Sequence, residues 1–318
     1  MNVEKTVHIA ADSPTEHRNL SSIGIDAYST EQIVDLLISS NQRVLDAVQA
    51  ESTHVAEAVE LGVRTWLNGG TIHYVGAGTS GRLGVLDSVE LLPTYHVGSD
   101  RVQAHLAGGT TAMMHAVEGA EDDCAAGYDI GSSLTNADLL FGITASGRTP
   151  FVGGALRGAR EVGAVTILLA SNPHAQLAAE ADLAILPDTG PELITGSTRM
   201  NAATAQKIIL NTFSTAVMVR CGKTFDNLMV DMVATNEKLQ ARMIRIICQA
   251  TGVSPESAWK ILTQADGQLR LALIMAFTGS TAEKASAASE QFPPDAHRQG
   301  DPSGIRTAVA ALKDTYEA

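Results

Sequence analysis

The sequence has few cysteines and few aromatic residues. Its three cysteines, Cys124, Cys221 and Cys248, show no C-x-x-C or similar spacing, which argues against a disulfide framework and a zinc site. We therefore expect a reducing compartment, the cytoplasm. Aromatic residues make up only 4% of the 318 residues, while small aliphatic residues are plentiful. This composition favours packed helices and α/β layers over an all-β sandwich.

Positive charge and long apolar runs are also lacking. The chain has 22 Lys and Arg against 35 Asp and Glu, a formal net charge of −13. Such an acidic chain is a poor partner for nucleic acid. No stretch reaches the roughly 18 consecutive apolar residues of a membrane span, and the first residues lack the apolar core of a signal peptide. We expect neither nucleic acid nor membrane as a partner, and a bound phosphate would need local positive potential.

What is present is a strand–glycine–helix pattern at residues 71–90, TIHYVGAGTSGRLGVLDSVE. A short β-like run ends in a glycine-rich turn, and a helical period follows. Such a turn brings the backbone close to an anion, and the first N–H groups of the helix point at it. The turn supplies Gly78, Thr79 and Ser80, and Arg82 is a candidate charge partner for a phosphate.

A second turn of this kind follows the buried run DLLFGIT. It reads ASGRTP and supplies Ser146, Gly147, Arg148 and Thr149. The first turn, GAGTSG at residues 76–81, has the G-x-G-x-x-G spacing, but no acidic residue for a ribose ends the second strand, and this argues against a dinucleotide site. Because ligands of parallel sheets bind at the carboxyl ends of strands, the two turns together favour one phosphorylated small molecule.

A third candidate is GPELITGSTRM at residues 190–200. Ser197, Thr198 and Arg199 open a long helical run, and this combination suits an anion at a helix N-terminus. The same residues also suit an ordinary helix cap. The sequence leaves both readings open.

The candidate acid–base groups are carboxylates. Glu90 lies down the helix from the first turn, and Glu121 belongs to the acidic run EGAEDD. Taken singly, each is most simply a solvated side chain. A reaction that needs one carboxyl group as acid and another as base would give both a role. The histidines show no metal-ligand spacing.

The chain predicts alternating strands and helices with right-handed crossovers, hence an α/β fold with a mainly parallel sheet and helices on both faces. We expect three parts: residues 1–50 as an N-terminal arm and helix, 51–225 as the α/β domain, and 226–318 as a small all-helical domain. Helices are also predicted through residues 113–117 and 227–251, and Pro93 is expected to end the helix that follows the first turn.

Together these motifs resemble the N-acetylmuramic acid 6-phosphate etherases. The match runs through TEHRN, GAGTSGRLGVLDSVE, AVEGAEDD, ASGRTP, GPELITGSTRM with TAQK, and NLMVDMVATNEKL. The chain departs from the family pattern in two segments: Leu91 and Leu92 precede Pro93 where Cys-Pro or Pro-Pro usually follows the glutamate, and Asn201 stands where a lysine is usual. The resemblance implies one sugar-isomerase (SIS) domain with a C-terminal helical domain, working as a homodimer.

The resemblance also implies an activity. The family cleaves the lactyl ether of N-acetylmuramic acid 6-phosphate (MurNAc 6-phosphate) to N-acetylglucosamine 6-phosphate (GlcNAc 6-phosphate) and D-lactate, in cell-wall sugar recycling, with no metal or organic cofactor. It places the proton donor at Glu90 and a second catalytic glutamate at Glu121. The hydroxyls of Thr79, Ser80, Ser146 and Thr149 would anchor the phosphate. Two alternatives use the same turns: an amino-sugar or keto-sugar phosphate isomerase, and a non-enzymatic sugar-phosphate regulator.

Overall fold

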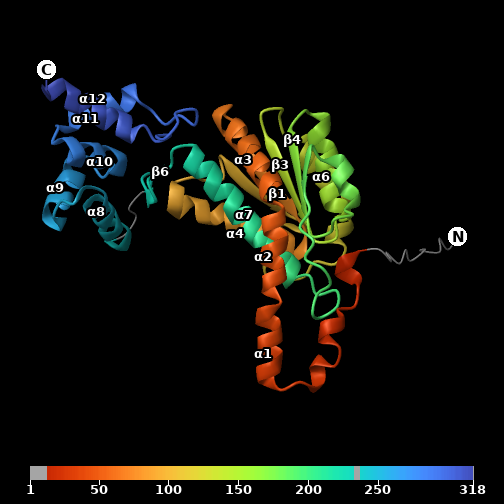
Figure 1. Cartoon of the computed structure of the whole chain (residues 1–318). Helices are drawn as coiled ribbons and strands as arrows, with labels where there is room; N and C mark the ends of the chain where they lie inside the picture. The colour runs from red at the N-terminus through yellow and green to blue at the C-terminus, as the bar shows by residue number, and fades with distance from the viewer. Residues whose placement is uncertain (1–12, 233–236, 318) are drawn as a thin grey trace. The chain divides into compact units, whose positions relative to one another are not determined.

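The computed structural model describes residues 13–232 and 237–317. Its central element is a five-stranded sheet in the order β2-β1-β3-β4-β5, in which every neighbouring pair is parallel (Figure 1). The strands are β1 (Ile72–Gly76), β2 (Val102–Leu106), β3 (Leu139–Thr144), β4 (Val165–Ala170) and β5 (Leu183–Ile185). The three inner strands, β1, β3 and β4, are mostly apolar and buried because helices cover both faces.

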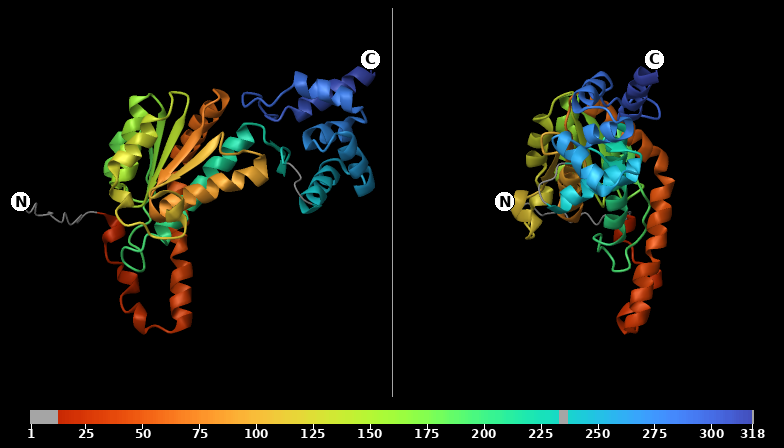
Figure 2. Two further views of the ribbon diagram at one scale, coloured as in Figure 1. Left: turned by 180° about the vertical axis from the view of Figure 1, so that it is seen from behind. Right: turned by 90° about the vertical axis from the view of Figure 1, so that its left-hand side faces the viewer.

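Helices cover both faces of the sheet (Figures 1 and 2). On one face lie α4 (Gly78–Tyr95) and α7 (Asn201–Arg220), where the ring of Phe213 packs on those of Tyr74 and Phe141. On the other lie α5 (Cys124–Ser132) and α6 (Pro150–Glu161), which form one apolar cluster with the inward side chains of β1, β3 and β4. The predicted α/β class is confirmed.

Helices α5 and α6 touch through glycines. A Cβ atom added to Gly127 would lie 1.9 Å from the carbonyl oxygen of Phe151, and one added to Gly154 would lie 2.1 Å from that of Cys124. Real side chains do not fit at such distances. The two backbones therefore approach more closely than any residue with a side chain would allow.

Three helices precede the first strand in the chain: α1 (Thr30–Ser39), α2 (Asn41–Ala50) and α3 (Ser52–Leu67). A capping box between Ser29 and Gln32 starts α1. Helix α1 has no buried residue although its sequence is largely apolar, and with the preceding 3₁₀ turns it projects from α2 (Figure 2). We call residues 19–39 the arm. Its base is fixed where Asn19 Nδ2 donates to the Pro191 carbonyl and Ser22 Oγ to the Leu193 carbonyl.

The C-terminal part is helical. After a hairpin of β6 (Thr224–Phe225) and β7 (Leu228–Met229) come α8 (Glu237–Thr251), α9 (Pro255–Gln264), α10 (Leu269–Thr278), α11 (Ala282–Gln291) and α12 (Ile305–Glu317). They share a core that includes Met243, Ile247 and Leu273. By compactness the chain divides into residues 1–61, 70–87 and 102–213, and residues 62–69, 88–101 and 214–318. The three-part division remains a prediction.

One predicted helix is absent, and the helix predicted over residues 227–251 is present only as α8, Glu237–Thr251. Residues 109–113 form a 3₁₀ turn and no helix runs through 113–117, since Met114 is 82% exposed and offers no face to bury. Residues 227–232 belong to the hairpin and the segment after it, while residues 233–236 lie outside the described structure. Conversely, α5 was not predicted, because its glycines weaken the helical pattern.

Pro93 does not end its helix as predicted. It lies inside α4, which continues to Tyr95. Proline removes one backbone donor, and in the last turn this affects a single helical hydrogen bond next to solvent. The helix ends at Tyr95 because the next residue, His96, has a left-handed φ of 54°, and the N–H of His96 donates to the Leu92 carbonyl.

Within residues 13–232 and 237–317, every helix is too short or too polar to cross a bilayer.

A pair formed by buried His73 and half-buried His105 makes the fold sensitive to acid. His73 Nδ1 and His105 Nε2 share a hydrogen bond of 3.0 Å. Burial first, and the charge of His105 second, lower the pKa of His73 to about 4, against a smaller opposing effect of Asp138. Burial also lowers the pKa of His105. Both rings are therefore held neutral in the folded chain.

This pair predicts a loss of stability below neutral pH. Because the folded pKa of His73 lies below the unfolded value, the unfolded chain binds more protons as the pH falls from about 6.5 through about 4. We expect His73→Gln to remove roughly 2 kcal/mol of the decrease in unfolding free energy between about pH 7.5 and about pH 5. Urea unfolding at the two pH values measures it. Equal decreases in wild type and variant would contradict the assignment.

Candidate functional site

The first turn lies between β1 and α4. Gly78, the first helical residue, has a φ of 54°, and a Cβ on Gly81 would lie 2.4 Å from the Gly76 carbonyl oxygen. The turn is thus tight and requires glycine. Thr79 is half-buried and Ser80 is buried beside it. The first N–H groups of α4 have no partner within the helix, which is the arrangement that binds anions.

The second turn, residues 145–149, follows β3 and is called here the phosphate turn. The side chains of Thr144 and Thr149 share a hydrogen bond of 2.8 Å, and Gly147 N donates to Thr144 Oγ1 at 3.3 Å. Gly147 has a φ of 72°, and a Cβ there would lie 2.3 Å from that of Ala175. Since β1 and β3 are paired with Gly76 opposite Ile143, the two turns begin at adjacent strand ends.

Two residues that the motifs did not single out hold the phosphate turn. Asn172 Nδ2 donates to the Ser146 carbonyl at 2.8 Å, and Gln206 Nε2 donates to the Thr144 carbonyl at 3.0 Å. Asn172 follows β4 and Gln206 lies on α7. Gln206 lies in the TAQK segment of the family resemblance, which gave this residue no role.

The predicted charge partners differ in their contacts. Arg82 donates from Nε and Nη2 to the Ala112 carbonyl, at 3.0 and 2.7 Å, and so holds the loop after β2. The guanidinium of Arg148 makes no hydrogen bond or ion pair with any described residue, and this side chain is half-buried in the phosphate turn. Arg148 is therefore the arginine of the pair whose charge is available to an anion.

The start of α7 already holds a carboxylate. Fully buried Glu192 accepts from Asn201 N at 2.9 Å and from Ala202 N at 3.0 Å. Burial raises the pKa of Glu192, while the two backbone N–H groups oppose this rise. Because the helix begins at Asn201, a ligand role for the preceding Ser197, Thr198 and Arg199 rests on their side chains alone, and it stays a prediction.

Both candidate catalytic carboxylates are exposed. Glu121 lies in the 3₁₀ turn Ala120–Asp122, directly before α5, and Asp123 caps that helix by accepting from Ala126 N at 2.9 Å. Glu90 lies in the later part of α4, in the second compact unit, whereas Glu121 and both turns belong to the first. Their catalytic roles stay predictions.

A buried polar contact fixes α4 against its neighbours. Tyr74 Oη donates to Asp87 Oδ2 at 2.8 Å, and Asn211 Nδ2 donates to Asp87 Oδ1 at 2.6 Å. Burial, followed by the charge of Asp87 and its hydrogen bond, raises the pKa of Tyr74. Strand β1 and helix α7 thereby hold the middle of the helix that begins at the first turn and carries Glu90.

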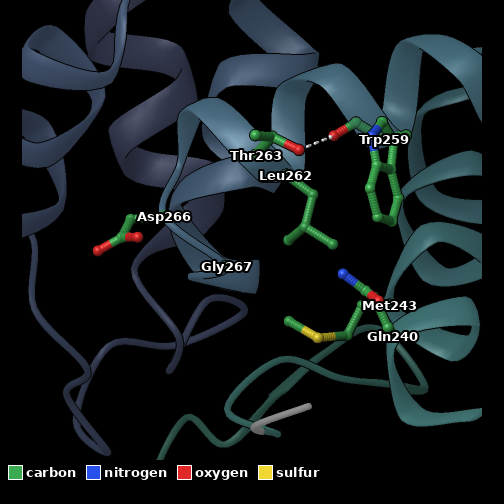
Figure 3. Close-up of a pocket in the computed structure, with 7 residues that line it drawn as sticks. All are labelled: Gln240, Met243, Trp259, Leu262, Thr263, Asp266 and Gly267. Atoms are coloured by element: carbon green, nitrogen blue, oxygen red, sulfur yellow. Dashed lines mark hydrogen bonds between the residues drawn. The ribbon is translucent and has the colours of Figure 1, made fainter. Parts of the chain in front are cut away.

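A pocket of about 400 Å³ lies in the C-terminal helical part (Figure 3). Its lining comprises Gln240, Met243, Trp259, Leu262, Thr263, Asp266 and Gly267. These residues include no arginine or lysine, so the pocket offers a phosphate no positive charge. Among the described residues, no group of three or more His, Cys, Asp and Glu could hold a metal ion.

The chain is similar to several known proteins. Residues 54–160 match the model of the glucokinase regulatory protein N-terminal SIS domain. An N-acetylmuramic acid 6-phosphate etherase of Thermobifida fusca is 52% identical over 266 residues, 84% of this chain and 88% of that one. One from Lactobacillus johnsonii is 46% identical over 86% of this chain and 93% of its own. A phosphoheptose isomerase structure from Francisella tularensis aligns with a TM-score of 0.47 at 19% identity, covering 60% of this chain and 98% of that one.

Proposed function

The chain belongs to the N-acetylmuramic acid 6-phosphate etherase family, and from this we propose how its residues cleave MurNAc 6-phosphate. It is a carbon–oxygen lyase that yields GlcNAc 6-phosphate and D-lactate. The observation that supports the substrate class is the pair of hydroxyl-rich turns at the adjacent ends of β1 and β3. Thr79, Ser80, Ser146 and Thr149 bind the 6-phosphate, and Arg148 supplies charge.

The reaction is an elimination followed by a hydration. In the open-chain sugar the C2 proton is α to the C1 aldehyde, so a carboxylate can remove it. As the C3–O bond breaks, a carboxylic acid protonates the departing lactate oxygen, and water then adds to C3 of the unsaturated aldehyde. We assign the acid to Glu90 and the base to Glu121. Phosphate binding supplies remote binding energy that holds C2 and C3 in place.

The alternatives are not favoured. An isomerase would move a proton between C1 and C2 and release no lactate, and a regulator would bind the sugar phosphate without turnover. Etherases match 84% to 86% of the chain. Proton NMR with amino-sugar and keto-sugar phosphates separates the first alternative, because only an isomerase converts one into the other.

Cleavage of synthetic MurNAc 6-phosphate in H₂¹⁸O tests the function. The proposed sequence breaks the bond between C3 and the ether oxygen, so D-lactate keeps the original oxygen and ¹⁸O appears on C3 of GlcNAc 6-phosphate. Mass spectrometry of the two products measures the label. Unphosphorylated MurNAc is the control and should react far more slowly. Label in lactate, or no lactate at all, would overturn the proposal.

The proposal includes a cytoplasmic homodimer. The arm leaves large apolar side chains in solvent, with Leu20 79% and Ile38 67% exposed. Exposed apolar surface on a projecting helix is typical of a protein interface. The two exposed glutamates also lack the desolvated surroundings that tune an acid–base pair, and a second copy would provide them. Cytoplasm agrees with three free cysteines.

Ile38→Asp tests the homodimer. We expect the variant to sediment as a monomer and to lose at least about tenfold of its lactate release, because a buried carboxylate at the interface is not compensated. Gln49→Asp, an exposed polar position on α2, adds the same charge and should remain a dimer. Sedimentation velocity measures the mass. A monomeric wild type, or a dimeric Ile38→Asp protein, would contradict the proposed interface.

A further inference from the structure

We propose that Gln206 is a positioning residue for phosphate binding. It does not touch the reacting atoms of the sugar, and it acts by holding the phosphate turn in its binding shape. The inference rests on the proposed function for its substrate, and on the contacts of α7 with the end of β3 for its geometry. No motif pointed to this role.

The hydrogen bond of Gln206 reaches the residue on which the turn is built. Its Nε2 donates to the carbonyl of Thr144, the last residue of β3. The hydroxyl of Thr144 in turn contacts Thr149 Oγ1 and accepts from Gly147 N. The middle and the last residue of the turn therefore depend on Thr144, and Gln206 fixes Thr144 relative to α7. Asn172 holds the middle through the Ser146 carbonyl.

The other half of the Gln206 amide has no partner. The side chain is 1% exposed, and Oε1 is buried without a hydrogen bond. Rotating the amide would bring Oε1 against the Thr144 carbonyl and two acceptors would face each other, so the observed orientation is fixed. A buried acceptor without a donor is unfavourable. An apolar side chain of similar size would remove this oxygen but would also take the donor from the Thr144 carbonyl, so the amide adds little net stability here.

The Nε2 donor and the Oε1 acceptor of Gln206 have opposite effects on stability when the amide is replaced. Gln206→Met loses the bond to Thr144 and also removes the unsatisfied oxygen, so the effects on stability offset one another. The effect on position is not offset, since the phosphate turn loses its tie to α7. A displacement of about 1 Å in a binding group weakens positioning up to about 10²-fold. Binding should change far more than stability.

The test combines three measurements on Gln206→Met. We expect the melting temperature to stay within about 2 °C of wild type. The Kd for inorganic phosphate, measured by ³¹P NMR titration, should rise about tenfold, and the KM for MurNAc 6-phosphate should rise similarly with kcat within about threefold. Thr212→Val is the matched control, because the Thr212 hydroxyl lies on the same helix and donates only to the Ile208 carbonyl. It should change none of these values.

Gln206→Glu supplies a second, independent readout. A protonated carboxyl group can donate to the Thr144 carbonyl and an ionised one cannot. The ratio of variant to wild-type phosphate affinity should therefore recover as the pH falls from about 8 towards about 5. A role in packing alone predicts no such recovery. If Gln206→Met unfolds, the pH dependence of this affinity ratio in Gln206→Glu still tests the positioning role of Gln206.

Unchanged phosphate affinity in Gln206→Met overturns the inference, and so does a pH-independent ratio in Gln206→Glu. Failure of the proposed function is distinguishable. A wild type that binds inorganic phosphate but releases no lactate contradicts the etherase assignment and leaves the phosphate measurements to decide the role of Gln206. A wild type that releases lactate while the variant keeps its KM contradicts the role of Gln206 alone.

Discussion

Glu121→Gln is expected to stop lactate release while the protein still binds sugar phosphate. The amide keeps the size of the side chain but cannot accept the C2 proton, and general acid or base catalysis is typically worth about 10²–10⁴-fold. Glu90→Gln should cause a loss of the same order, because lactate would depart as an unprotonated alkoxide. A coupled D-lactate assay measures both. Glu121 is exposed, so neither folding nor melting temperature should change much.

Deuterium exchange separates the two glutamates. In D₂O, a variant that lacks the acid but keeps the base should still exchange the C2 proton without releasing lactate. Glu90→Gln should therefore show C2 exchange by NMR, and Glu121→Gln should not. The reverse pattern would exchange the roles of the two residues. Glu118→Gln, in the same acidic run, is the control and should retain activity. Full activity in either main variant would overturn its catalytic role.

The second large effect is on stability. Gly127→Ala would place a methyl group 1.9 Å from the Phe151 carbonyl oxygen, and α5 would have to separate from α6. Overpacking of this kind costs about 3 kcal/mol or more, because backbone cannot move aside as a flexible side chain can. Urea unfolding measures the free energy.

Gly69→Ala is the control for Gly127→Ala. No atom lies within 4 Å of the added methyl group, and only the left-handed backbone, with a φ of 78°, opposes it. That strain is worth about 1–2 kcal/mol. Equal destabilisation by the two substitutions would show that contact with α6 does not determine the cost at Gly127.

The sheet was predictable because its signals are local. Most strands are apolar runs with glycine, proline or asparagine close to their ends, and the two glycine-containing turns closely follow β1 and β3. Helix α5 and the non-helical segment at 113–117 were not, because contacts with other parts of the chain decide them. Glycines that weaken α5 in isolation let it pack on α6, and the carbonyls of Ala112 and Met113 are held by Arg82.

The residues of the candidate site also differ in whether local sequence or long-range contacts place them. The residues of the first turn and the phosphate turn are consecutive, so the sequence exposes them as motifs. Gln206 is separated from Thr144 by 62 positions, and only the fold brings its amide to the end of β3. Glu192 looked like part of an anion-binding helix start, whereas its own carboxylate fills that position. A sequence pattern typical of anion binding does not show whether the bound anion is an external ligand or a carboxylate of the protein itself.

The glycine contacts between α5 and α6 have a consequence for substrate choice. Helix α5 begins three residues after Glu121, and α6 begins directly after Thr149 of the phosphate turn. Because the two helices pack backbone to backbone, they fix the distance between the proposed base, Glu121, and the proposed phosphate anchor, Thr149. A sugar phosphate is therefore a substrate only if the distance between its acidic C2 hydrogen and its phosphate group matches this distance in the protein. The enzyme would thus recognise the distance from the 6-phosphate to C2, and the 4-phosphate of the same sugar, which keeps C1 free to form the aldehyde, should not be cleaved.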